Sequence, residues 1–136
     1  MKPSDMFKNF EQHLSEEDRK WNKMLDLWTE GEAASPYAEL LTYQGEVYNG
    51  GYYQYFCNVD ATGDLRKEMS ALRKILPPPL WLTLWLAYRA YLFLEKHPDK
   101  EYSALEWYVE TSEYVFYLYE KRIDRILKAY AATVEL

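Results

Sequence analysis

Residues 80–94 carry a single charged side chain, Arg89, among fifteen positions. A helix that is apolar on every side is either buried in a protein core or spans a membrane. A helical membrane span needs about 20 apolar residues, so this stretch is too short to cross a bilayer. It therefore predicts a central helix against which the other helices pack. Its all-round aromatic character leaves open that one face forms the interface of a homodimer.

Helical patterns surround this stretch on both sides, with apolar residues recurring at spacings of three and four. The length of 136 residues fits one domain with its own core. We therefore expect an all-α fold, a single compact bundle of about six helices that spans residues 1–136. The expected helices cover 4–13, Ser15 to Gly31, Pro36 to the glycines at 50 and 51, 52 to 58, 64–76, 80–94 and 101–132. A turn-rich linker is expected over 59–64, with Asp60 or Thr62 as the cap of the helix that follows.

The sequence Asn49-Gly50-Gly51 predicts a break between two helices. Glycine readily adopts the left-handed conformation that closes the end of a helix, because it lacks a Cβ atom. Gln54 follows among aromatic residues, and a buried amide without partners would cost about 1–3 kcal/mol. We expect backbone groups freed at the break to serve as those partners. The same residues could instead form a functional surface, and both interpretations stay open.

The stretch from Asn49 to Asn58 resembles the N-G-G-aromatic-x-Q-aromatic-aromatic-x-N motif of a helical bacterial family of unknown function. That family includes a DNA mimic, a protein that binds a transcription regulator in place of DNA. The residues that carry the resemblance are Glu46, Asn49, Gly50, Gly51, Tyr52, Gln54, Tyr55, Phe56 and Asn58. The resemblance implies an interaction protein whose partner is a basic, DNA-binding protein.

The residues that could carry out chemistry do not form a catalytic pattern. Cys57 is the one thiol, and a reactive cysteine needs a neighbouring base. His13 and His97 are predicted to lie at helix ends in polar surroundings, and Cys57 is predicted to be a packed apolar residue. No spacing of Cys and His suggests a metal site. We expect no enzyme activity, no metal and no cofactor, although a small-ligand or enzymatic site built from Asn49, Gln54 and Asn58 is the alternative.

Acidic residues gather on one side of the helix expected over 101–132. Between residues 101 and 120 there are five glutamates and no lysine or arginine. At 100° per residue, one arc of about 80° on that helix carries Glu106, Glu110, Glu113, Glu120 and Asp124. Salt-bridge partners at a spacing of four residues are missing over 101–120, which distinguishes this face from an ordinary charged surface. We expect this acidic face to bind a protein with a basic surface.

Composition narrows the class of partner and the compartment. The net charge of −6 disfavours direct binding to nucleic acid, which requires clustered Lys and Arg. A single cysteine cannot form an internal disulfide and fits a reducing compartment. The start of the sequence lacks the apolar segment of a signal peptide. We therefore expect a cytoplasmic protein that does not bind membranes.

Overall fold

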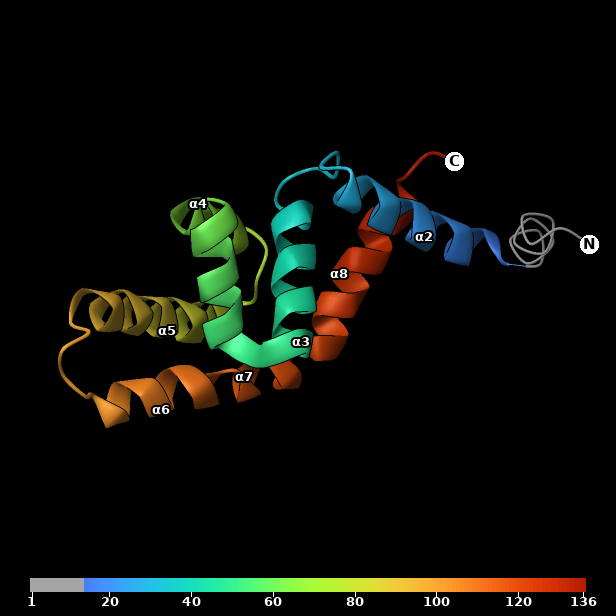
Figure 1. Ribbon diagram of the computed structural model, residues 1–136. Coiled ribbons are helices and arrows are strands. Elements are labelled where there is room, and N and C mark those ends of the chain that lie inside the picture. Colours follow the sequence, from blue (N-terminus) through green and yellow to red (C-terminus); the bar gives the residue numbers. More distant parts are fainter. Residues whose placement is uncertain (1–13) are drawn as a thin grey trace, which may run out of the picture.

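The computed structural model describes residues 14–136, and these residues fold into helices joined by short turns (Figure 1). The helices are α2 (Glu16–Thr29), α3 (Tyr37–Thr62), α4 (Leu65–Arg73), α5 (Pro78–Lys96), α6 (Ser103–Ser112), α7 (Tyr114–Leu118) and α8 (Glu120–Ala132). Residues 14–136 contain no strand, which confirms the predicted all-α bundle. The helix expected over 4–13 and His13 lie outside the described residues.

Helix α2 begins where its capping signal predicts. The Ser15 hydroxyl accepts a hydrogen bond from the backbone N–H of Asp18 at 3.1 Å, which satisfies one of the free donors of the first turn. The helix ends at Thr29, two residues before Gly31, whose φ of 77° reverses the chain. Helix α2 then packs against α8, which crosses it in Figure 1.

Helix α3 contains the predicted break. Gly51 has φ 83° and ψ −170°, far from helical values, and the two halves of α3 run in different directions on either side of it (Figure 1). The second half buries Tyr52, Tyr55, Phe56 and Val59, which recur at helical spacing on one face. The aromatic part of the motif is therefore part of the core.

The prediction of a turn-rich linker over 59–64 is wrong, because α3 continues as far as Thr62. The cap of the next helix is Asp64, whose carboxylate accepts a hydrogen bond from the backbone N–H of Lys67 at 3.1 Å. Asp60 and Thr62 are still helical and cannot act as this cap. Helix α4 ends at Arg73, earlier than expected, and it buries Leu65, Met69 and Leu72, while Leu76 is buried just beyond its end.

Helix α5 contacts α3, α4, α6 and α7, as expected of the apolar stretch 80–94. In Figure 1, α4 lies above α5 and α6 lies below it. Three large apolar side chains of α5, Leu82, Leu86 and Phe93, form an exposed stripe, the kind of face that the sequence left open as a homodimer interface. Its neighbours cover the remaining faces, and no helix among residues 14–136 covers this stripe. Self-association through the stripe stays a prediction.

The single helix expected over 101–132 is divided into α6, α7 and α8. The divisions fall at Glu113 and at Tyr119, where ψ rises to −21° and 9° respectively. At these two divisions the chain changes direction around α3, and α8 runs beside the first half of that helix (Figure 1). None of the helices within residues 14–136 is both long enough and apolar enough to cross a bilayer.

Candidate functional site

The polar residues of the motif bind one another at the bend of α3. Gln54 Nε2 donates a hydrogen bond to Glu46 Oε2 at 3.2 Å, and Asn58 Nδ2 donates to the same oxygen at 2.8 Å. The expectation that backbone groups at the break bind Gln54 is wrong, because the Glu46 carboxylate provides the acceptor. Asn49 is exposed. Two amides and a carboxylate thus clamp the two halves of α3 together.

The two glycines at the bend have different roles. A Cβ atom at Gly50 would lie 1.9 Å from Oε1 of Gln54, so the side chain of Gln54 folds over this position. A Cβ atom at Gly51 would lie 2.7 Å from Oε1 of Glu113, which belongs to the turn between α6 and α7. Burial raises the pKa of Glu113, and the nearby charge of Glu110 raises it further. The bend therefore brings the motif and the acidic face into contact.

Two more acids of the predicted acidic face bind α3 directly. Asp124 Oδ1 accepts a hydrogen bond from Gln44 Nε2 at 3.0 Å, and Glu120 Oε2 accepts one from the hydroxyl of Tyr48 at 2.8 Å. These bonds hold α8 against the first half of α3. Glu120 and Asp124 are half-buried as a result, so they are less available to a partner than a surface stripe would be.

The other two acids lie on α6, near the second half of α3. Burial raises the pKa of Tyr53, and the charges of Glu106 and Glu110 raise it further. Glu106 is half-buried, whereas Glu110 is exposed. Of the five predicted acids, Glu110 is thus the one that is open to solvent.

An exposed aromatic surface accompanies Glu110. We call it the α6–α7 surface, and it consists of Trp107, Glu110, Tyr114, Tyr117 and Leu118. The exposed fractions of Trp107, Tyr114 and Leu118 are 65%, 69% and 81%. Tyr114 and Leu118, four residues apart, lie on one side of α7, and Trp107 and Glu110, three residues apart, lie on one side of α6. The sequence interpretation missed this surface, because the side chains that face solvent depend on the helix breaks at Glu113 and Tyr119, which the residue spacing does not indicate.

The residues considered for chemistry are dispersed. Cys57 is exposed, so the prediction that it is packed is wrong. It lies beside the buried face of the second half of α3 rather than on it. His97 lies at the end of α5, where Nδ1 is 2.9 Å from the carbonyl oxygen of Phe93, as expected of a residue at a helix end. Residues 14–136 contain no cluster of Cys, His, Asp and Glu that could hold a metal ion.

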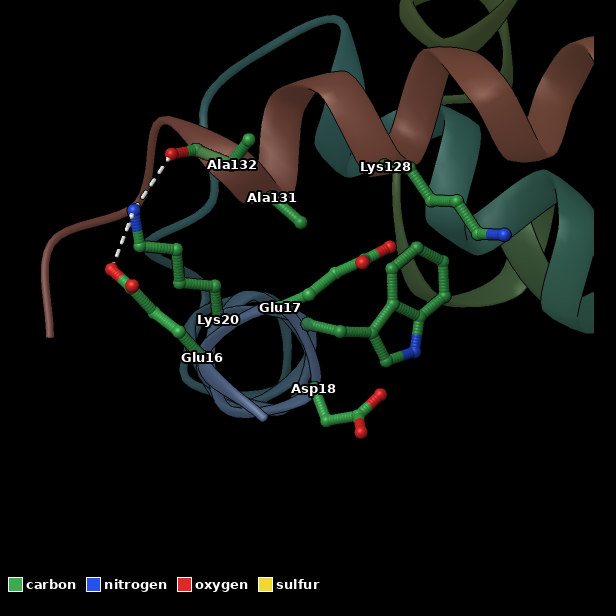
Figure 2. Close-up of a pocket in the computed structure, with 8 residues that line it drawn as sticks. Glu16, Glu17, Asp18, Lys20, Lys128, Ala131 and Ala132 are labelled. Atoms are coloured by element: carbon green, nitrogen blue, oxygen red, sulfur yellow. Dashed lines mark hydrogen bonds and ion pairs between the residues drawn. The ribbon is translucent and has the colours of Figure 1, made fainter. Parts of the chain in front are cut away.

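Three cavities along the described chain lie away from the bend of α3. One cavity, of about 540 Å³, lies between the start of α2 and the end of α8 (Figure 2). Lys20 Nζ lies 3.5 Å from a carboxylate oxygen of Glu16 and donates to the carbonyl oxygen of Ala132 at 3.1 Å. Two further cavities border α4, and none of the three is lined by Asn49, Gln54 or Asn58. The cavity between α2 and α8 is therefore lined by both acidic and basic side chains, and Lys20 links the start of α2 to the end of α8.

A cavity of about 410 Å³ between α3 and α4 contains two neighbouring carboxylates, Glu39 and Glu68. Burial raises the pKa of Glu68 to about 7, and the charge of Glu39 contributes to the shift. The hydroxyl of Tyr55 donates a hydrogen bond to Glu68 at 3.3 Å. One oxygen of Glu39 accepts from Ser35, while the other is buried without a hydrogen-bond partner among the described residues. This pair of carboxylates makes stability depend on pH.

We expect Glu68→Gln to stabilise the protein at pH 8 and to leave it unchanged at pH 4. The pKa of Glu68 is raised in the folded state, so protonated Glu68 contributes to the stability of the fold. This contribution is fully present below about pH 4.5 and is lost as the pH rises through about 7. Glutamine stays neutral and can still accept from Tyr55. Partial exposure screens the charge, so the gain at pH 8 is about 1–2 kcal/mol. Urea denaturation at both pH values measures it, with the exposed Glu32→Gln as the control. Equal stability of parent and variant at pH 8 would refute the raised pKa.

Comparisons of the chain with protein-family models, with curated proteins and with solved structures found no match. The family resemblance of the motif at 49–58 therefore stays a prediction.

Proposed function

We propose that this protein is a non-catalytic binding protein whose α6–α7 surface takes up a basic segment of a protein partner. The exposure of Trp107, Tyr114 and Leu118 beside Glu110 carries the proposal. Large apolar side chains gathered on a surface are typical of interaction sites. Trp and Tyr also supply a large share of the binding energy in protein interfaces.

The charge around this surface defines the chemistry of the partner. Residues 101–120 include five glutamates and neither lysine nor arginine. An arginine of the partner could lie over the ring of Trp107 or Tyr114 while its charge faces Glu110. Negative charge also accelerates the approach of a positive partner and repels nucleic acid. A DNA-binding protein has such a basic surface, and the family resemblance of the motif suggests a transcription regulator in the cytoplasm.

The motif residues have a supporting role in this proposal. Glu46 binds both Gln54 and Asn58, and Gly51 admits the carboxylate of Glu113. The hydrogen bonds of Glu46 fix the bend of α3, and the close approach at Gly51 places the turn between α6 and α7 against that bend. The alternative of a small-ligand site at Asn49, Gln54 and Asn58 has less support, since the amides of Gln54 and Asn58 already have an acceptor and none of the three cavities is located there.

We expect Trp107→Ala to weaken binding of the partner about 30-fold, because truncation of a central aromatic residue costs about 2 kcal/mol. The partner is first captured from a lysate of the native host by the parent chain and then purified, and its dissociation constant is measured by calorimetry. Trp107 is largely exposed, so this variant should fold normally. Leu82→Ala, at an exposed position of α5, is the matched control and should bind like the parent.

Glu110→Gln should slow association and reduce the dependence of the association rate on salt, because it removes an exposed charge from the surface. A captured partner with an acidic surface would contradict the proposal. So would a Trp107→Ala variant that binds as tightly as Leu82→Ala.

A further inference from the structure

The groove between α4 and α5 has the opposite charge to the rest of the molecule. It encloses about 400 Å³, and its lining residues include Arg66, Arg73, Trp81, Trp85 and Arg89, with no acidic residue. Residues 65–94 contain five basic residues and one acidic residue, a local charge of +4 in a chain of net charge −6. The acidic residue, Glu68, lines the cavity on the other side of α4.

Two of the arginines lie over the faces of two tryptophans. Arg73 Cζ is 5.2 Å from the ring centre of Trp81, and Arg89 Cζ is 5.6 Å from that of Trp85. The two indoles stack on each other at 6.1 Å, and Trp81 Nε1 donates to the carbonyl oxygen of Met69 at 3.2 Å. The spacing of four residues between Trp81, Trp85 and Arg89 places all three on one side of α5. The indoles therefore hold the guanidinium groups at the groove by their flat faces.

The guanidinium groups have no counter-charge within the described chain. Arg66, Arg73 and Arg89 form no ion pair and donate no side-chain hydrogen bond among residues 14–136, where the ion pair present joins Lys20 to Glu16. A guanidinium group that stacks by its face keeps its N–H donors at the edge, and these match the two oxygens of a phosphate.

We propose that the groove binds a small organic phosphate of the nucleoside monophosphate class. The phosphate would accept hydrogen bonds from the guanidinium group of Arg73, and the organic part would lie against Arg89, the apolar side chains of Met69 and Leu92 and the exposed edges of the indoles. The volume of the groove is within the range of small-ligand sites. The groove is lined by residues of α4 and α5, whereas the α6–α7 surface belongs to α6 and α7. Figure 1 shows α4 and α6 on opposite sides of α5, so the two proposals are independent.

The test is isothermal titration of the full chain with adenosine monophosphate, adenosine, inorganic phosphate and a single-stranded DNA of twelve thymidines. We expect adenosine monophosphate to bind at least ten-fold more tightly than either adenosine or inorganic phosphate, since each of these lacks one half of the ligand. Absence of binding would overturn the proposal. Tighter binding of the DNA strand with a steep dependence on salt would also overturn it, in favour of a nucleic-acid site. Inorganic phosphate as tight as adenosine monophosphate would refute the contribution of the organic part.

Variants at the groove give a second readout. Arg73→Gln and Arg89→Gln should each weaken binding of adenosine monophosphate at least ten-fold, and Arg73→Lys should give an intermediate loss, because lysine keeps the charge but not the paired donors. Lys74→Gln removes an exposed positive charge from the residue next to Arg73 and does not line the groove, so it should bind within two-fold of the parent. Equal losses in Lys74→Gln and Arg73→Gln would show a general charge effect and would overturn the site. Both arginines are exposed, so melting temperatures should be unchanged.

Discussion

Replacement of Gly51 by valine is expected to lower the free energy of unfolding by about 3–4 kcal/mol, which combines backbone strain with overpacking. The φ of 83° and ψ of −170° at Gly51 belong to a region that only glycine occupies at low energy. A Cβ atom there would also lie 2.7 Å from Oε1 of Glu113. The melting temperature should fall by roughly 10 °C or more.

Two further variants separate the causes of this loss. Gly45 is a helical glycine of α3, and the nearest atom to an added Cβ is 4.0 Å away, on Trp28, so Gly45→Ala should be neutral or stabilising by up to about 1 kcal/mol. The double variant Gly51→Ala/Glu113→Ala removes the steric clash but keeps the backbone strain, so it should be more stable than Gly51→Ala. If Gly51→Val melts like the parent, the bend of α3 does not need glycine.

Replacement of Phe116 by alanine is expected to cost about 3–5 kcal/mol, the usual loss for a large side chain removed from a core. Phe116 is fully buried on α7. Its ring meets the rings of Tyr43 and Tyr48 edge to face, at 5.4 Å and 5.5 Å between centres. Because both tyrosines belong to the first half of α3, this ring holds α7 against α3.

Urea denaturation measures this loss, and two substitutions calibrate it. Phe116→Leu keeps most of the volume and should cost less than about 1.5 kcal/mol. Leu118 lies two residues away and is exposed, so Leu118→Ala should change stability by less than about 0.5 kcal/mol. Similar stabilities of Phe116→Ala and Leu118→Ala would mean that α7 is not anchored through this ring.

The local features of the fold could be predicted because their causes are local. Ser15 caps α2 through a bond to a residue three positions away, and Gly51 breaks α3 because it lacks a Cβ atom. The apolar stretch 80–94 could be placed inside a bundle from its length and charge. The misplaced cap shows the limit, because Asp60, Thr62 and Asp64 are all suitable residues and packing of the second half of α3 selects Asp64.

The acidic face shows why the rest could not be predicted. Its five residues share one arc only on an unbroken helix, and the breaks at Glu113 and Tyr119 depend on how α6, α7 and α8 wrap around α3. Gln44 and Tyr48, the side chains that bind Asp124 and Glu120, lie 80 and 72 residues away in the chain. No local pattern records such partners.

The sequence by itself determined an all-helical chain, a break at Gly51, an apolar α5 and an excess of negative charge, because propensity, periodicity and composition act over a few residues. The tertiary structure alone decided which charges and rings remain available. It turned Glu120 and Asp124 toward α3, left Trp107 and Tyr114 in solvent, and brought arginines of α4 and α5 to one groove. These outcomes depend on contacts between residues far apart in the chain, which exist only after the helices have packed.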